Sequence, residues 1–256
     1  MNTEAIKEIL RTALRNKFSH YNPESGAMPF HTRLLGADRL ALYSFIHSLC
    51  TNFGTSIFEP VALALGQGTF AECKKQFTPN DKISRQAQRV IQDIIDGLNV
   101  AATIPAKLEE IERIRAVCQA GEMHNIKPTK VDLMLKSHNG ELYFFDIKSA
   151  KPNSNEFKQF KRTLLEWVAV TLAENPQAKI STGIAIPYNP YAPESYARWT
   201  MRGMLDLQEE LKVAEEFWDF LAGVGTYQSL LDCFEQVGIE MRSEIDEYFA
   251  RFKALK

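Results

Sequence analysis

One segment, residues 131–148, constrains the fold of this chain more than any other. Its sequence, VDLMLKSHNGELYFFDIK, has two β-prone runs on either side of Asn139-Gly140. An Asn-Gly dipeptide between such runs is the strongest short-range signal of a β-hairpin. Both runs are apolar at nearly every position, which is typical of strands covered on both faces. The segment therefore predicts a hairpin inside an α/β or α+β core.

Charged residues interrupt this apolar hairpin near its two ends: Asp132 in the first run, and Asp146 and Lys148 in the second. Carboxylates are costly inside a sheet that is covered on both faces, and a divalent metal would be a chemical reason to keep them there. Asp132 and Asp146 could hold a hard cation such as Mg²⁺, with the Ile147 carbonyl as a further ligand. Such an ion would lower the pKa of a bound water and offset the charge of a phosphate.

Lys148 would then orient that water and stabilise the transition state. The simpler interpretation of Asp132, Asp146 and Lys148 is an ion pair at the end of a strand. The sequence context favours catalysis over that interpretation.

The register of the hairpin decides whether the two aspartates meet. A two-residue loop of Asn139 and Gly140 would send the Asp132 side chain to the opposite face from Asp146. A three-residue loop that includes His138, with Gly140 in the left-handed region, shifts the pairing and places Asp132 directly across from Asp146. The metal-site interpretation therefore predicts a three-residue loop or an equivalent bulge.

Apolar periodicity predicts the elements around the hairpin. Helices are expected over residues 3–15, 37–52, 56–65, 81–97 (capped by Asn80) and 105–120. A long helix should follow Ser154, with an apolar stripe of Phe157, Phe160, Leu164, Trp167 and Val168. A strand is expected over 179–187, and mostly helical structure over 204–253.

These elements predict a mixed α/β fold in which a central mixed β-sheet is flanked by helices. The chain has no internal repeat and no linker rich in Gly, Ser or Pro. We therefore expect a single domain over 1–256, with a helical N-terminal part to about residue 125, a catalytic core over about 126–200 and a helical C-terminal part.

Composition narrows the classes of function. The formal net charge of -2 means that any nucleic-acid site must be a local basic patch. No apolar run reaches the roughly 18 residues of a membrane span, and the N-terminus lacks the features of a signal peptide. The four cysteines are far apart and form no CxxC or Cys/His cluster, which argues against structural zinc and disulfides. A cytoplasmic location is expected.

The order of Asp, hairpin, Asp-x-Lys and basic helix resembles the PD-(D/E)xK nuclease motif, with Val131 where a proline usually precedes the first Asp. The wider chain is similar to type II restriction endonucleases, and most to their TdeIII-like family. The segments that carry this resemblance are MPFHTRLLG (28–36), GTSIFEPVA (54–62), DIKSAKPN (146–153), AIPYNPYAP (185–193) and FLAGVGTYQSLLDCFEQVG (220–238).

The resemblance implies a restriction-endonuclease-like core and Mg²⁺-dependent hydrolysis of double-stranded DNA. It also implies a cognate DNA methyltransferase that acts on the same site. The TdeIII-like family is associated with the interrupted palindrome GGNCC, which becomes the expected target. Since cutting both strands of a palindrome calls for two active sites, a two-fold homodimer is expected.

In that superfamily a glutamate on a helix before the hairpin often joins the site, and Glu59 is the residue that matches. It lies in the apolar segment of Phe58 and Pro60, where a lone carboxylate is unusual. The alternative is an exposed residue in the first helical turn, favoured by the helix dipole and by Pro60. The sequence does not decide between the two.

Several basic and polar residues are candidates for DNA contacts. Lys158, Lys161 and Arg162 share one helix face, which beside a metal site would be a phosphate-binding track, although a solvated face is the usual explanation. The other candidates are Arg33, Lys151 and Asn189.

Two other functions stay open from the sequence. A repair or recombination nuclease with the same core would cut according to DNA structure rather than sequence. A non-catalytic DNA-binding module would keep only a relic of the site. Digestion of plasmid DNA with Mg²⁺ distinguishes all three, since only a site-specific enzyme gives discrete bands.

Overall fold

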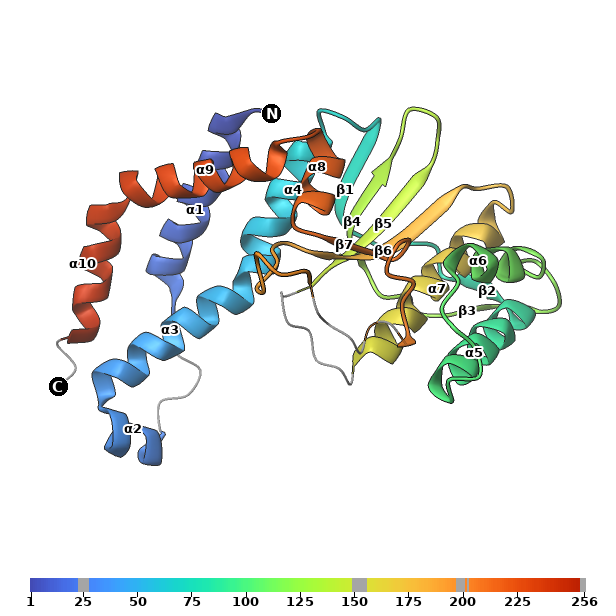
Figure 1. The fold of residues 1–256 in the computed structure, drawn as a ribbon, viewed down its shortest axis with the longest axis horizontal. Coiled ribbons are helices and arrows are strands. Elements are labelled where there is room, and N and C mark those ends of the chain that lie inside the picture. The colour runs from blue at the N-terminus through green and yellow to red at the C-terminus, as the bar shows by residue number, and fades with distance from the viewer. Residues whose placement is uncertain (23–27, 149–155, 197–200, 202, 254–256) are drawn as a thin grey trace.

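The structure is a computed structural model of the chain and describes residues 1–22, 28–148, 156–196, 201 and 203–253. A five-stranded mixed sheet in the order β1-β4-β5-β6-β7 forms its centre (Figure 1). β1, β4 and β5 are antiparallel neighbours, whereas β6 and β7 continue the sheet in parallel. The strands are β1 (Glu72–Phe77), β4 (Val131–Lys136), β5 (Leu142–Ile147), β6 (Ile180–Ile186) and β7 (Leu211–Val213).

Helices flank this sheet on both faces, which confirms the expected fold class. They are α1 (Thr3–His20), α2 (Pro29–Leu35), α3 (Ala37–Phe53), the π-helical η1 (Gly54–Phe58), α4 (Glu59–Gly66), α5 (Arg85–Asn99), α6 (Lys107–Arg115), α7 (Phe157–Glu174), α8 (Glu215–Ala222), α9 (Thr226–Glu240) and α10 (Arg242–Lys253). In the described part of the chain, none of these helices has the length and apolar character needed to cross a membrane.

The β4–β5 hairpin has the predicted register. Met134 pairs with Phe144, and the Ser137 N–H donates to the Glu141 carbonyl at 2.9 Å, which closes a three-residue loop. Gly140 in that loop has φ +85°, the left-handed conformation expected of it. The sequence prediction of a three-residue loop is therefore confirmed.

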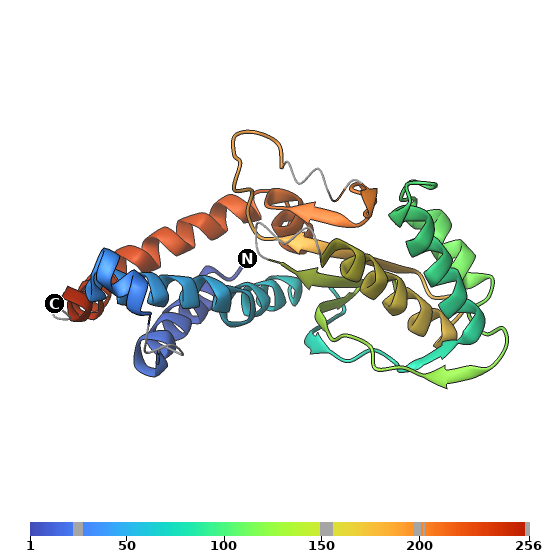
Figure 2. The same ribbon diagram turned by 90° about the horizontal axis from the view of Figure 1, so that it is seen from below.

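The two faces of the hairpin belong to two hydrophobic cores. Leu133 and Phe145 point into a core shared with α1, α4, α8 and α9. Met134 and Phe144 point into a core shared with α5, α6 and α7. Figure 2 shows the terminal helices gathered at one end of the molecule and α5 to α7 at the other. The predicted apolar stripe of α7 lies fully inside the second core.

The helix expected over 81–97 is only partly correct. Residues Lys82–Ser84 form strand β2, which pairs with β3 (Met123–Asn125) in a small separate sheet. The following helix, α5, is capped by the Ser84 hydroxyl, which accepts the Ala87 N–H at 3.0 Å, and not by Asn80. The buried Ile83 explains the difference, because its pairing with β3 extends the backbone where a helix was expected.

Two further boundaries differ from the predictions. The helix expected over 105–120 is the shorter α6, followed by turns. β1 was not predicted at all, because its sequence ECKKQF is polar. It lies at the edge of the sheet, where one side of a strand stays open to water.

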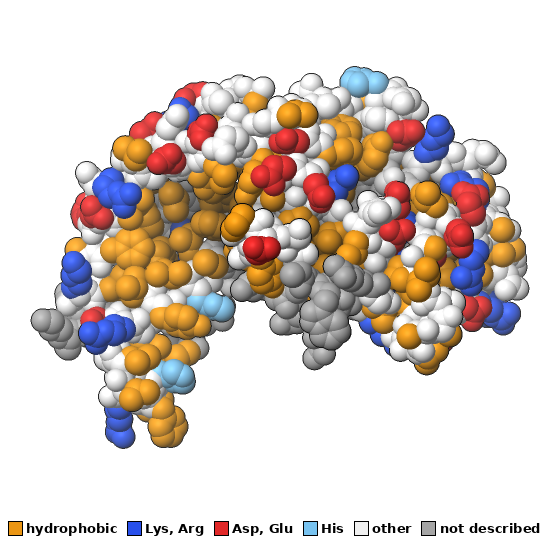
Figure 3. Space-filling model, in the orientation of Figure 1, with side chains coloured by type: hydrophobic (Ala, Val, Ile, Leu, Met, Phe, Trp, Pro, Cys, Tyr) orange, Lys and Arg blue, Asp and Glu red, His pale blue; other side chains and the backbone are white. Residues whose placement is uncertain are grey.

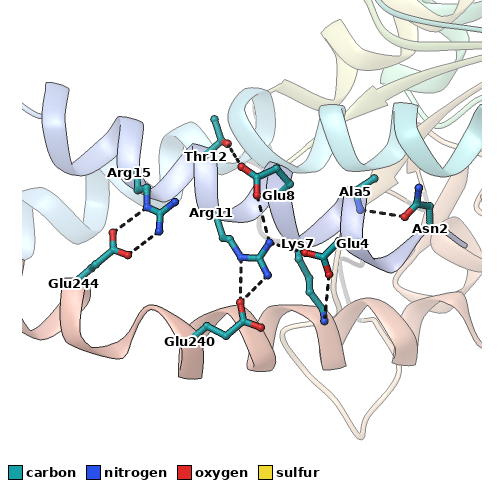
Figure 4. A network of polar contacts seen from close by, with 10 residues as sticks. All are labelled: Asn2, Glu4, Ala5, Lys7, Glu8, Arg11, Thr12, Arg15, Glu240 and Glu244. Atoms are coloured by element: carbon teal, nitrogen blue, oxygen red, sulfur yellow. Dashed lines mark hydrogen bonds and ion pairs between the residues drawn. The ribbon is translucent and has the colours of Figure 1, made fainter.

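A surface ion network fastens the first helix to the last two (Figure 4). Arg11 donates to Glu240 at 2.7 and 3.0 Å and also contacts Glu4. Arg15 pairs with Glu244 on α10 at 2.8 Å. Exposed pairs of this kind add little stability, because water and salt screen them, so the network orients helices that the hydrophobic core already holds together.

Candidate active site

Asp132 and Asp146 lie opposite each other at the end of the hairpin remote from its loop. The register that pairs Leu133 with Phe145 places Asp132 across from Asp146 one step further along. Asp132 Oδ2 accepts the Ile147 N–H at 2.8 Å, so this carboxylate turns toward β5. The two aspartates therefore share the end of two adjacent strands, as the metal-site hypothesis requires.

Lys148 follows directly after β5 and contacts Asp146. Its Nζ lies 2.6 Å from Asp146 Oδ1, and its side chain is 31% exposed whereas that of Asp146 is 8% exposed. The same Nζ lies 5.2 Å from the centre of the Phe160 ring on α7. A partly exposed cation thus borders a buried carboxylate, with an aromatic ring on another side.

Glu59 reaches the same place from the first residue of α4. It is only 3% exposed, so the alternative of an exposed helical residue is wrong. Its Oε2 accepts a hydrogen bond from Gln76 Nε2 at 2.9 Å, and the same nitrogen donates to Asp132 Oδ1 at 3.1 Å. One amide nitrogen therefore joins Glu59 to Asp132.

Gln76 is a member of this site that sequence reasoning missed. It lies on β1 between Lys75, which pairs with Leu133, and Phe77, so it faces Asp132. Its φ of +51° is left-handed, a conformation uncommon for residues other than glycine and concentrated at functional sites. No signal in the polar run ECKKQF could have revealed it. We call Glu59, Gln76, Asp132, Asp146 and Lys148 the carboxylate cluster.

The electrostatics of the carboxylate cluster show an excess of negative charge. Burial raises the pKa of Asp146 to about 7, because the opposing charge of Lys148 does not compensate and the charge of Asp132 adds to the effect. Burial also raises the pKa of Glu59, although the hydrogen bond from Gln76 acts in the opposite direction. Within the cluster three carboxylates thus have one lysine, and the charge of the neighbouring Lys75 also acts to lower the pKa of Glu59.

Oxygen ligands with excess negative charge fit a hard divalent cation in their chemistry. Among the described residues, however, no group of three or more His, Cys, Asp or Glu side chains is arranged to hold a metal ion. The Gln76 amide lies between Glu59 and Asp132. Asp132 and Asp146 are therefore the pair that fits a cation, with Glu59 one amide away.

The predicted phosphate-binding track on α7 needs correction at Lys161. Lys158 is exposed, and Arg162 is half-buried and donates to Gln92 at 2.6 Å. Lys161 is fully buried, and its Nζ lies 2.5 Å from Glu110 and 2.6 Å from Glu210. It cannot reach a phosphate, because its charge is already neutralised inside the protein.

The other candidates for DNA contacts lie elsewhere. The Asn189 side chain closes its own loop, since it donates to the Glu194 carbonyl and accepts the Tyr191 N–H. Both ends of its amide are thus engaged within the protein. Arg33 is exposed on α2. Lys151 lies outside the described residues.

The carboxylate cluster lies at the end of the hairpin opposite its loop. In Figure 1 the β4–β5 loop points up, and the end of the hairpin that carries the cluster points down. Figure 3 shows that this lower side is concave beside the α2–α3 helices.

Comparison with known proteins points to one family of enzymes. The family model described as "Type II restriction endonuclease, HinfI" matches residues 2–238. The type II restriction enzyme HgiCII of Herpetosiphon aurantiacus is 26% identical over 221 residues, which covers 85% of this chain and 80% of the relative. The type II restriction enzyme MjaII of Methanocaldococcus jannaschii is 26% identical over 236 residues, with 82% of this chain and 62% of the relative covered.

Type II restriction endonucleases are hydrolases that cut double-stranded DNA at specific sites and generally need a divalent metal. The matched range includes the whole carboxylate cluster, from Glu59 to Lys148. By the extent of this match, the chain belongs to the HinfI family of type II restriction endonucleases.

Proposed function

We propose that the carboxylate cluster is the catalytic centre at which this restriction endonuclease hydrolyses DNA with Mg²⁺. One observation carries the proposal: Asp132 and Asp146 lie opposite each other across the hairpin, with Lys148 Nζ 2.6 Å from Asp146. The excess negative charge of the cluster supports it, because perturbed carboxylates in a concave site are typical of catalytic centres.

Asp132 and Asp146 would hold the cation, with the Ile147 carbonyl as a further ligand. A bound divalent cation would supply Lewis acidity and offset phosphate charge. Lys148 would orient the attacking water and stabilise the charge that develops on the phosphate. Glu59 would complete the negative surroundings of the cation. In-line attack by water would leave a 5′-phosphate and a 3′-hydroxyl.

Lys158 and Arg162 are the described basic residues that would contact the DNA backbone near the cluster. They extend from α7, the helix whose Phe160 ring lies beside Lys148. Because Lys161 is buried, this phosphate-binding track has two basic residues and not the three that the sequence predicted. Arg33, on α2, would contact DNA at the other end of the concave side.

Four further properties are proposed from the sequence resemblance alone. They comprise membership of the TdeIII-like group, cleavage at GGNCC, a homodimer with one site for each strand, and a cognate methyltransferase that protects the same sequence. A cytoplasmic location is part of the same proposal.

Digestion of plasmid DNA tests the proposed function. The protein should give discrete fragments with Mg²⁺ and none with EDTA, and sequencing of the fragment ends should give the target and the cut position. A heterogeneous smear would favour a structure-specific nuclease. The absence of cleavage on DNA that contains GGNCC and the other short palindromes would contradict the proposal.

A further inference from the structure

The side chain of Lys148 has a second neighbour besides Asp146, the aromatic ring of Phe160. Phe160 lies in the first turn of α7, and the Lys148 Nζ sits over its ring at 5.2 Å from the ring centre. The face of an aromatic ring carries partial negative charge, so an ammonium within about 6 Å of the ring centre is attracted to it. The ammonium is thus held by a carboxylate at 2.6 Å and by a ring that has no net charge.

The packing of α7 fixes the Phe160 ring in place. Phe160 is 7% exposed and belongs to the core shared with α5, α6 and α7. Its ring centre lies 6.0 Å from that of Phe157, which is also buried and precedes it by three residues. Leu164, one turn further along the helix, is fully buried in the same core. The flexible side chain of Lys148 therefore meets a rigid partner.

The two partners of Lys148 differ in their response to a cation on Asp146. In the proposed function Asp146 is a metal ligand, and a divalent ion on its carboxylate repels an ammonium at ion-pair distance. The ring of Phe160 is not a metal ligand, so its attraction for the ammonium remains when the ion is bound. A lysine side chain has a flexible four-carbon stem and loses much conformational freedom when it is fixed. Without the ring, the partly exposed Lys148 would turn toward solvent once Asp146 is occupied.

We propose that Phe160 is a positioning residue for Lys148, an inference that rests on the proposed role of Lys148 in cleavage. The face of the ring keeps the ammonium beside the carboxylate cluster while Asp146 holds the cation, so Lys148 stays within reach of the attacking water and the phosphate. The alternative is that Phe160 only fills the core and the aliphatic stem of Lys148 packs on it, as such stems do on apolar surfaces. The charge distribution of the ring separates the two, because it can be changed without changing the size of the side chain.

Replacement of Phe160 by trifluorophenylalanine tests the inference, because fluorine withdraws negative charge from the ring face and leaves the shape nearly unchanged. Single-turnover cleavage of plasmid DNA with enzyme in excess separates the maximal rate from the half-saturating enzyme concentration. In this variant and in Phe160→Leu the maximal rate should fall about tenfold, with the half-saturating concentration within about twofold of wild type. Phe160→Tyr keeps the ring face and should cleave within about twofold of the wild-type rate.

Phe157→Leu is the matched control. It removes a buried ring from the same helix and the same core, and this ring contacts Phe160. Its maximal rate should stay close to that of the wild type. If Phe160→Leu fails to fold, the trifluorophenylalanine variant decides, because its core stays filled.

A second readout needs no cleavage. In protein with isotope-labelled lysine, NMR detects the ε-methylene protons of Lys148, which are identified by their loss in Lys148→Ala. The ring current of Phe160 should shift them upfield of the other lysines, both in EDTA and with Mg²⁺, and Phe160→Leu should abolish this shift. An upfield shift that is absent in EDTA, or that disappears with Mg²⁺, would overturn the inference.

Wild-type cleavage by the trifluorophenylalanine variant would mean that only the size of Phe160 matters, and it would overturn the inference. An equal loss of rate in Phe157→Leu would do the same, because the effect would then belong to the core. A protein that cuts no plasmid at all would contradict the proposed function instead. The NMR shift would then decide by itself whether Phe160 holds the Lys148 ammonium.

Discussion

Two buried groups of charges lie among the described residues, and they differ in their balance of positive and negative charge. The carboxylate cluster has three carboxylates and one lysine, and Lys148 is partly open to solvent. The second group, which we call the lysine–glutamate quartet, joins α6, α7 and the segment before β7. All its side chains are at most 5% exposed, and its N–O distances are 2.5 to 2.8 Å. Its members are Lys107, Glu110, Lys161 and Glu210.

The balance of charge gives the two groups opposite electrostatic character. Burial acts to raise the pKa of Glu210, but the charges of Lys107 and Lys161 outweigh it, so this pKa is lowered. Burial raises the pKa of Asp146 to about 7, because one lysine cannot neutralise the charge around it. A balanced, sealed group joins secondary structure elements, whereas an unbalanced group at a concave surface has a use for a further cation.

The largest effect should follow from changes in the carboxylate cluster itself. Asp146→Asn keeps the size of the side chain but removes a metal ligand, and Lys148→Ala removes the cation beside the phosphate. We expect either change to lower the cleavage rate by about a thousandfold or more, with the fold intact. Plasmid digestion and circular dichroism measure both. Cleavage at the wild-type rate by either variant would remove that residue from the catalytic centre.

Changes in the lysine–glutamate quartet should affect the stability of the fold and not the cleavage chemistry. Lys161→Met leaves two buried glutamates with one lysine and should lower the free energy of unfolding by about 3–5 kcal/mol. Lys158→Met, an exposed lysine on the same helix, should change it by less than about 0.5 kcal/mol. Urea denaturation compares the two. Equal midpoints would mean that the quartet does not stabilise the fold.

Glu59 tests whether the cluster extends to α4. Glu59→Gln keeps the size of this buried side chain and removes a charge that burial already disfavours. The rate of cleavage should fall about a hundredfold while the melting temperature stays the same or rises. If the rate were normal and only the stability changed, Glu59 would belong to the helix and not to the catalytic centre.

Gln76 should give the smallest effect of the series. Gln76→Ala removes the bridge between Glu59 and Asp132 but no charge, so cleavage should slow by about tenfold. The affinity of this variant for Mg²⁺ should also change, because Glu59 and Asp132 lose the hydrogen-bond donor that holds them in place. If Gln76→Asn keeps both the cleavage rate and the Mg²⁺ affinity while Gln76→Leu loses them, the amide group is the part of Gln76 that matters. An unchanged metal affinity in Gln76→Ala would contradict a positioning role.

The part of the site that local sequence could predict lies in one hairpin, and Glu59 was a candidate only through the family resemblance. The Asn-Gly turn located it, and the need for Asp132 to meet Asp146 gave the loop length that the structure has. These are local relations within 18 residues, and local turn chemistry fixes the register of a hairpin. The chemical role of the two aspartates and Lys148 remains a proposal.

The missed parts depend on contacts between distant segments. Gln76 lies on a polar edge strand, whose pairing with β4 has no local signal. The spacing of Lys158, Lys161 and Arg162 describes one helix face correctly. It cannot show that the middle residue meets Glu110 and Glu210, which lie 51 and 49 residues away. Burial of a lysine is decided by the partners that the fold brings to it.

Calorimetric titration of Mg²⁺ into the protein without DNA tests the central claim most directly. The wild type should bind the ion, and Asp146→Asn should bind it about a hundredfold more weakly or not at all. Glu166→Gln should bind it like the wild type, since Glu166 on α7 is also partly buried but lies outside the carboxylate cluster. Equal affinity of Asp146→Asn and the wild type would contradict the assignment of the cluster as the metal-dependent centre.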